Sequence, residues 1–209
     1  MTTQTIKVGI CGLGTVGQGV IALLSEGGDV LSNRVGGTIE LVHVATRTPK
    51  PEVHTLGARD SRDVFDVARD PDVDVLIELI GGTTVAKDLV VEALNHGKHV
   101  VTANKALLAD HGEELFALAE SKGVALRFEA AVAGGIPVIE AVKTSLAGNH
   151  VSSVAGIING TGNFILTEMA AKGREFSDVL AEAQALGYAE ADPTFDVDGT
   201  DAAQKLVLL

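Results

Sequence analysis

The chain has 209 residues and a formal net charge of −12, and 46% of its residues are apolar. This length suits one large domain or one and a fraction, and the apolar share is enough for a substantial core. The strong acidity excludes an obvious nucleic-acid surface, because binding to a phosphate backbone needs clustered basic residues. No apolar run approaches the roughly 18 residues of a membrane span, and residues 1–6 lack the basic and apolar segments of a signal peptide.

The cysteine and histidine content indicates a reducing compartment and no zinc site. The single Cys11 excludes an internal disulfide framework. The six histidines form no H-x-x-x-H pair, and the sequence contains no C-x-x-C pair. We therefore expect a cytoplasmic protein.

The first two thirds of the chain alternate apolar strands with helical segments. Strands are predicted at residues 6–11, 38–46, 73–80, 98–104 and 124–132. Helices are predicted at residues 15–26, 85–96 and 110–122, and Gly123 is placed to cap the last one in the left-handed conformation. Strands that alternate with helices are typical of parallel βαβ units. The expected fold class is therefore α/β, with a Rossmann-type, doubly wound parallel sheet.

The pattern changes after the glycine pair at residues 134–135. A helix is predicted at residues 137–146, a strand at 151–158, and further helices at about 163–172 and 177–186. We therefore expect residues 1–135 to form a nucleotide-binding domain and residues 136–209 to form a smaller α+β substrate domain. The chain stops inside the apolar element Lys205–Leu209, so we expect this second domain to be incomplete.

A glycine fingerprint follows the first predicted strand and opens the first predicted helix. Gly12 permits a tight turn, Gly14 lets the backbone approach a pyrophosphate, and Gly17 allows close helix–strand packing. The N-terminus of the helix offers free N–H donors to the anion. A simple glycine turn is the alternative, but the strand–turn–helix context favours a dinucleotide site. Its expected residues are Gly12, Leu13, Gly14, Thr15, Val16 and Gly17.

The end of the second predicted strand indicates which dinucleotide is bound. An NAD site usually has an acid there that hydrogen-bonds the ribose 2′-hydroxyl. This chain has Ala45, Thr46 and Arg47 instead, and the forked guanidinium of Arg47 can pair with a 2′-phosphate. NADP is therefore the expected cofactor, with NAD as the second choice. The alternative is an exposed Arg47 without a ligand role.

Acidic side chains gather near the end of the sequence, and a lysine follows them on a helical pattern. Asp201 and Lys205 are four residues apart, so on a helix they share one face. Together with the acids at positions 190, 192 and 196, they can hold a small amino-acid-like substrate and give it a proton. An ordinary exposed ion pair, worth a few tenths of a kcal/mol, is the alternative.

Five motifs together resemble homoserine dehydrogenase. They are Gly12–Gly17 (GLGTVG), Thr102–Leu108 (TANKALL), Glu129–Pro137 (EAAVAGGIP), Asn159–Ile165 (NGTGNFI) and Gly187–Pro193 (GYAEADP). The resemblance covers residues 6–209, and its last three motifs are far more specific than the glycine fingerprint. It implies reversible reduction of L-aspartate 4-semialdehyde to L-homoserine with NADPH or NADH, a step towards threonine, methionine and isoleucine. It also implies a homodimer.

The same resemblance implies roles for individual residues. Lys205 matches the proposed acid/base residue, and Glu190 matches an acid that contacts homoserine. Asp196 and Asp201 match acids of the same pocket, and Lys105 matches a lysine that lies between cofactor and substrate. A helix-start Lys105 without a further role is the alternative.

A sodium site is also implied by the resemblance. Its residues match Glu129, Val132, Gly134 and Ile136, which provide one carboxylate and main-chain carbonyls. Oxygen-only ligation from a turn suits a hard cation. A solvent-facing Glu129 at the end of a strand is the alternative.

The expected chemistry agrees with these roles. Reducing an aldehyde requires a hydride at carbon and a proton at oxygen, and a lysine ammonium beside the carbonyl can stabilise the developing charge and donate that proton. Two other hypotheses stay open: another Rossmann oxidoreductase that acts on a small aldehyde or alcohol, and a folded nucleotide-binding fragment without activity.

Overall fold

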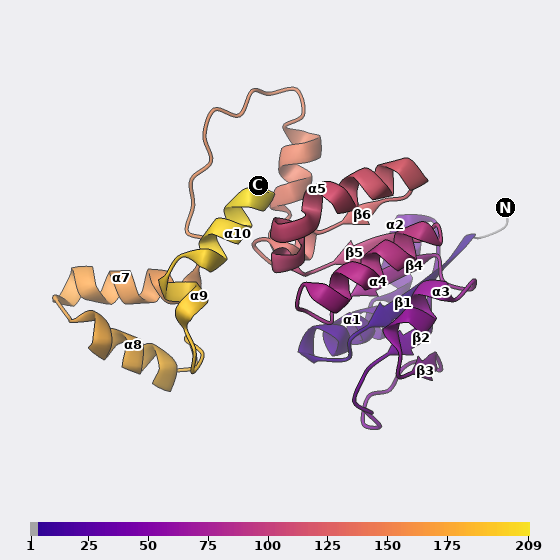
Figure 1. Cartoon of the computed structure of the whole chain (residues 1–209), viewed down its shortest axis with the longest axis horizontal. Helices are drawn as coiled ribbons and strands as arrows, with labels where there is room; N and C mark the ends of the chain where they lie inside the picture. The colour runs from indigo at the N-terminus through magenta and orange to yellow at the C-terminus, as the bar shows by residue number, and fades with distance from the viewer. Residues whose placement is uncertain (1–3) are drawn as a thin grey trace. The chain divides into compact units, whose positions relative to one another are not determined.

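The computed structural model describes residues 4–209, and these fall into two compact units (Figure 1). The first unit ends at Ala131, and the second runs from Val132 to Leu209. Within residues 4–209, no helix is both long and apolar enough to cross a membrane.

A six-stranded, all-parallel sheet forms the centre of the first unit, with strand order β3-β2-β1-β4-β5-β6. Its strands are β1 (Gln4–Cys11), β2 (Gly37–Ala45), β3 (Arg59–Ser61), β4 (Val75–Glu78), β5 (His99–Thr102) and β6 (Leu126–Arg127). The helices are α1 (Thr15–Glu26), α2 (Gly28–Val35), α3 (Val64–Arg69), α4 (Thr84–Asn95) and α5 (Lys105–Lys122), and a 3-10 turn, η1 (Glu129–Ala131), follows β6. This strand order is that of a Rossmann-type sheet, so the expected fold class is confirmed.

The core of this unit lies on both faces of β1. Its last four residues, Val8 to Cys11, are all buried. Because successive side chains of a strand point to opposite faces, both faces of the sheet are covered. Ile10 lies in an apolar cluster with Leu41 and Val44 of β2.

Three short elements of the first unit were missed by the sequence analysis. Helix α2, strand β3 and helix α3 have eight, three and six residues. Such segments are too short to show a clear hydrophobic period, and α2 has no buried residue. Helix α2 also lengthens the connection to β2, so Arg47 lies farther from the glycine turn than the roughly 20 residues that separate the glycines from the acid of an NAD site.

Two predicted boundaries in this unit were wrong. Helix α5 begins at Lys105 instead of residue 110, because the side chain of Asn104 caps it by accepting a hydrogen bond from the backbone N–H of Leu107 at 3.1 Å. Strand β6 ends at Arg127 instead of residue 132, since the chain turns into η1. The predicted left-handed cap at Gly123 is confirmed, with φ at 67°.

All regular structure within residues 132–209 is helical. The elements are α6 (Val138–Glu140), the π-helix η2 (Ala141–Ser145), α7 (Gly160–Lys172), α8 (Phe176–Ala185), α9 (Thr194–Val197) and α10 (Thr200–Leu208). Helices α7 and α8 pack against each other, and α9 contacts both α7 and α10. The buried side chains here include Ile165, Val179 and Ala183.

The strand predicted at residues 151–158 is wrong, because this segment has no regular secondary structure. Val151, Val154 and Ile157 are 45%, 50% and 79% exposed. A strand requires a neighbour for its backbone N–H and C=O groups, and residues 132–209 offer none. The apolar pattern alone therefore did not produce a strand.

An ionic cluster around the buried carboxylate of Asp70 joins β2, β3 and the end of α3. One carboxylate oxygen of Asp70, Oδ2, lies 2.6 Å from His43 Nδ1 and 3.0 Å from Arg59 Nη1. Its other oxygen accepts the backbone N–H of Asp72 at 3.0 Å. Burial acts to raise the pKa of the Asp70 carboxyl, but the Asp72 N–H, His43 and Arg59 outweigh it and hold this pKa below its ordinary value of 3.8. The ionised carboxylate therefore stabilises the folded first unit.

We predict that Asp70→Asn lowers the free energy of unfolding by about 1–3 kcal/mol at neutral pH, because the substitution removes the charge of a buried carboxylate that has three polar contacts. A lowered folded pKa gives stability that is present above 3.8 and is lost as the pH falls through the folded value. The gap between wild type and variant should therefore shrink on acidification in urea titrations at several pH values. Asp88→Asn, at an exposed position of α4, is the control and should change stability by less than about 0.5 kcal/mol. A pH-independent gap would contradict the assignment.

Candidate functional site

The glycine turn after β1 has two glycines that the fold itself requires. Gly12 has φ at +104°, and a Cβ there would lie 2.5 Å from the backbone oxygen of Leu79. A Cβ on Gly17 would lie 2.0 Å from the backbone oxygen of Gly12. These two positions therefore exclude a side chain for reasons internal to the chain.

Gly14 differs from these two glycines. Its φ is −72°, and a Cβ there would have no atom within 4 Å. It is the N-cap of α1, with no side-chain cap, so the first N–H groups of this helix are free for an anion. The absent side chain leaves space for a ligand, as expected where a pyrophosphate approaches the backbone.

A cavity of about 680 Å³ opens beside this turn on the β2 side. Gly12, Leu13 and Gly14 line it together with three basic residues, Arg47, Lys50 and Arg62. Arg47 itself is exposed. One acid, Asp63, lines the cavity as well, and its carboxylate caps α3 by accepting the backbone N–H of Phe65 at 2.9 Å. The three basic residues outnumber it, so the lining carries a net positive charge that suits a phosphate group.

Arg62 was not found by the sequence analysis. Its guanidinium forms a two-pronged pair with the carboxylate of Asp60, at 2.8 and 2.6 Å, and also donates to the backbone oxygen of Thr46 at 3.2 Å. It follows β3 directly, at the strand end next to that of β2. The sequence could have indicated Arg62 as a basic residue at the end of β3, the strand beside β2. The prediction missed it because β3 has only three residues and was not recognised as a strand.

A second cavity, of about 350 Å³, lies on the β4 side of the same turn. Val16 of α1 lines it together with Glu78, Asn104 and Lys105, and it shares Leu79 and Gly81 with the first cavity. The two cavities thus flank the point where the strand order reverses between β1 and β4. Open α/β sheets bind dinucleotides across this point.

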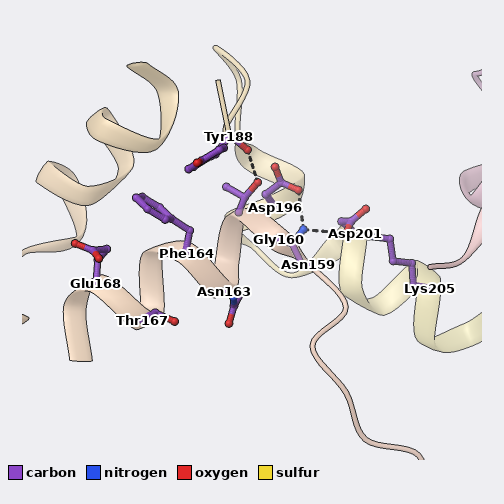
Figure 2. Close-up of a pocket in the computed structure, with 11 residues that line it drawn as sticks. Asn159, Gly160, Asn163, Phe164, Thr167, Glu168, Tyr188, Asp196, Asp201 and Lys205 are labelled. Carbon is purple, nitrogen blue, oxygen red and sulfur yellow. Dashed lines mark hydrogen bonds and ion pairs between the residues drawn. The ribbon is translucent and has the colours of Figure 1, made fainter. Parts of the chain in front are cut away.

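The second unit contains a cavity of about 650 Å³ that Lys205 and Asp201 line (Figure 2). Lys205 Nζ donates to Asp201 Oδ2 at 2.6 Å and to the backbone oxygen of Ile158 at 2.8 Å. The two side chains of the pair are only 20% and 10% exposed. Asp201 and Lys205 have the i, i+4 spacing of an ordinary helix ion pair, but both side chains are largely buried in the cavity wall, unlike an exposed surface pair.

Asn159 holds the acidic residues of this cavity together. Its Nδ2 donates to Asp196 Oδ1 and to Asp201 Oδ2, each at 2.8 Å, as Figure 2 shows. Its Oδ1 accepts the backbone N–H of Gly162 at 2.6 Å, so the same side chain caps α7. The sequence analysis did not assign Asn159 a role, although an asparagine before a helical segment is a recognisable N-cap signal.

Aromatic side chains form another part of the wall. Phe164 and Tyr188 meet edge to face, with ring centroids 5.2 Å apart. The hydroxyl of Thr161 donates to the backbone oxygen of Tyr188 at 2.6 Å, which fixes the loop before α9 onto α7. The cavity therefore has one polar, charged end and one aromatic side.

Glu190 is not brought together with these residues. Its side chain is exposed and is not part of the cavity wall. Its backbone oxygen accepts a hydrogen bond from Gln184 Nε2 at 3.1 Å. Of the four acidic and basic residues expected in the substrate pocket, the structure thus groups Asp196, Asp201 and Lys205.

The residues of the expected sodium site lie near the join of the two units. Glu129 begins η1, Val132 is buried, and Gly134 and Ile136 are exposed. Ala133 has φ at +48° and Gly135 at +87°, so the backbone here turns sharply. Across residues 4–209, no three His, Cys, Asp or Glu side chains form a metal-binding group.

Two family matches cover most of the chain. Residues 12–129 match the homoserine dehydrogenase NAD-binding domain, and residues 137–209 match the homoserine dehydrogenase family. The chain is 59% identical over 206 residues to homoserine dehydrogenase of Pseudomonas aeruginosa and 50% identical over 207 residues to that of Neisseria gonorrhoeae. Each match covers 99% of this chain and 48% of the relative.

A solved structure supports the same relationship. The crystal structure of a homoserine dehydrogenase from Thiobacillus denitrificans superposes with a TM-score of 0.92 at 51% identity. The match covers 98% of this chain and 48% of that one. The chain thus spans about half the length of the relatives it matches.

We predict that an alanine at Gly14 mainly weakens cofactor binding, whereas an alanine at Gly17 mainly lowers stability. Gly14→Ala should stay within about 1 kcal/mol of wild-type stability, because its Cβ meets no atom, yet weaken NADPH binding at least about tenfold. Gly17→Ala should lose about 3 kcal/mol of stability, because its Cβ collides with backbone. Thermal unfolding and NADPH fluorescence titration measure the two effects. Unchanged NADPH affinity in Gly14→Ala would refute a ligand beside this turn.

Proposed function

The chain belongs to the homoserine dehydrogenase family, and on this premise we propose that it provides the cofactor site and part of the substrate site for the reversible reduction of L-aspartate 4-semialdehyde to L-homoserine. The relatives are about twice as long as this chain, so activity of the 209 residues alone belongs to the proposal. The observation that carries it is the ammonium of Lys205, held by Asp201 in the wall of a cavity of about 650 Å³ that Asp196 and Asn159 also line.

In this proposal, the ammonium of Lys205 donates the proton that the reduced carbonyl oxygen takes up. A bound nicotinamide supplies or accepts the hydride at carbon. Contacts with Asp201 Oδ2 and the Ile158 oxygen use two of the three N–H donors of the ammonium, and we assign the third to the carbonyl oxygen of the substrate. A charged donor fixed there stabilises the alkoxide as it forms and then protonates it.

The acidic residues bind the other end of the substrate in this proposal. Asp196 and Asp201 share the donor Asn159 Nδ2, and their carboxylates are assigned to the α-ammonium of homoserine. Glu190 is assigned to the same ammonium from the loop after α8. Lys105, which lines the cavity on the β4 side of the glycine turn, is assigned to the substrate carboxylate or carbonyl.

We predict that Lys205→Ala retains NADPH affinity within about twofold and loses at least about 100-fold in the turnover of homoserine with NADP⁺. NADPH affinity should be retained because the cofactor cavities are lined by residues of the first unit. Turnover should fall because the substitution removes the proton donor. Fluorescence titration and absorbance at 340 nm measure the two properties of the purified 209-residue chain.

Lys172→Ala is a matched control for Lys205→Ala. Lys172 also pairs with an acid one turn away, Glu168, but Lys172 is 61% exposed. Glu168 lines the same cavity and keeps a second partner in the variant, Arg174 at 3.2 Å. Removal of the Lys172 side chain should leave turnover unchanged. Full turnover by Lys205→Ala would overturn the assigned role, and a wild-type chain that binds NADPH without turnover would restrict the proposal to cofactor binding.

A preference for NADP over NAD is the second part of the proposal. Arg47, Lys50 and Arg62 line the same cavity, at the end of β2 where an NAD site usually carries an acid. A 2′-phosphate placed there would meet three basic side chains. Asp60 keeps the fork of Arg62 in a fixed orientation and partly offsets its charge.

We predict that Arg47→Asp raises the dissociation constant for NADPH at least about tenfold while that for NADH changes less than about twofold. The phosphate loses an attractive partner and meets a repulsive one. Isothermal titration with both cofactors is the measurement. Arg34→Asp, an exposed position on α2 outside the cavity, serves as the charge-matched control. Equal losses for NADPH and NADH would count against a 2′-phosphate contact.

Three further features are proposed from the family relationship. A monovalent cation, Na⁺ for preference, would bind Glu129 and the carbonyls of Val132, Gly134 and Ile136. Its test is a comparison of turnover in NaCl with turnover in choline chloride.

A homodimer is also proposed, in line with the strongly exposed apolar side chains Ile157 and Phe195. Sedimentation velocity distinguishes a dimer from a monomer. A cytoplasmic location follows from the cofactor and from the single, buried Cys11.

A further inference from the structure

We infer that the buried carboxylate of Glu78 is a positioning residue for the nicotinamide half of the cofactor and acts through Thr102 and Asn104. This inference rests on the proposed function, since it requires a dinucleotide across the glycine turn. Glu78 is the last residue of β4 and has no exposed surface.

Full burial of a carboxylate is unusual and needs hydrogen-bond donors around it. Glu78 Oε1 accepts the backbone N–H of Ile80 at 2.9 Å and that of Gly81 at 3.3 Å. Its Oε2 accepts the hydroxyl of Thr102 at 2.5 Å. The carboxylate accepts in all three bonds, so it ties the loop after β4 to the end of β5.

The link continues from Thr102 into the next loop. The Thr102 hydroxyl, which donates to Glu78, also accepts the backbone N–H of Asn104 at 3.0 Å. Asn104 Nδ2 in turn donates to the backbone oxygen of Gly82 at 2.6 Å, while its Oδ1 caps α5. The chain of bonds therefore closes on itself, from Glu78 through Thr102 and Asn104 to Gly82 and back along the loop.

The two loops joined in this way form the walls of the cavity on the β4 side of the glycine turn. Gly81 and Gly82 line it with φ at +70° and +72°, and Asn104 leads directly to Lys105. An apolar residue at position 78 would fill the core equally well, but it would leave two N–H groups and a hydroxyl without an acceptor. The Glu78 carboxylate therefore contributes more to the conformation of these two loops than to the packing of the sheet.

The positions of the two cavities indicate which half of the cofactor depends on the hydrogen bonds of Glu78, Thr102 and Asn104. The cavity with Arg47 and Arg62 lies on the β2 side and suits the adenosine half with its phosphates. The cavity that Glu78 shapes lies on the β4 side and is left for the nicotinamide half. A change in the network should therefore weaken the whole dinucleotide and spare the adenosine fragment.

The test compares NADPH with adenosine 2′,5′-bisphosphate on the 209-residue chain. Thr102→Val replaces the hydroxyl by a methyl group of similar size, and Glu78→Gln replaces one acceptor oxygen by a donor NH₂. Each variant should weaken NADPH about tenfold, change affinity for the fragment less than twofold, and reduce the fluorescence gain of bound NADPH. Thr102→Ser restores the hydroxyl and should return NADPH affinity to within about threefold of wild type.

Further variants keep the test decisive if a buried substitution prevents folding. Asn104→Ser retains a good helix cap but is too short to reach Gly82, so it should give the same split between the two ligands. Val90→Ala creates a cavity in buried α4 and should lower stability without a split.

Each outcome addresses one of the two claims. Equal losses for both ligands, or no loss for NADPH in the three network variants, overturn the positioning role of Glu78. A wild-type chain that binds neither NADPH nor the fragment overturns the proposed function itself, because the cofactor site would then be absent.

Discussion

Two backbone hydrogen bonds at the end of β1 fix the geometry on which the cofactor site depends. The N–H of Gly12 donates to the oxygen of Ala45, and the N–H of Leu79 donates to the oxygen of Cys11, both at 2.8 Å. They hold the ends of β2, β1 and β4 at one edge of the sheet. Gly12 can then turn the chain into α1 only with a positive φ and without a side chain, because the Leu79 oxygen occupies the place of a Cβ. The glycine turn, Arg47 and Glu78 all take their positions from this pairing.

Buried polar groups in the first unit divide into two kinds. Asp70, with His43 and Arg59, joins two strands to the end of a helix and stabilises the unit. Glu78 joins two loops that line a cavity, and its partners are backbone and hydroxyl groups with no basic side chain among the three bonds described. The first kind resists unfolding, and the second maintains a surface shape. Both carboxylates cost desolvation, and in both cases each carboxylate oxygen has at least one donor that offsets this cost.

The second unit depends on a single amide in a comparable way. Asn159 begins α7, and with the same side chain it joins Asp196 of α9 to Asp201 of α10. Since Asp201 also receives Lys205, one residue links helix formation to the placement of the proposed proton donor. Residues 151–158, just before Asn159, carry exposed apolar side chains and form no strand, and α7 begins directly after the capping side chain of Asn159.

The sequence by itself determined the parallel α/β fold, the glycine turn and the family, because hydrophobic periods, glycines and local motifs act over a few neighbouring residues. It also predicted Asp201 and Lys205 on one helix face, a relation that spans a single turn. It did not find Arg62, Asn159 or Glu78 as members of a site. Glu78 meets Thr102 across 24 residues and Asn159 meets Asp201 across 42, and such contacts exist only once strands and helices have packed. It also predicted a strand at residues 151–158, since apolar side chains favour a strand but only a paired neighbour can satisfy its backbone.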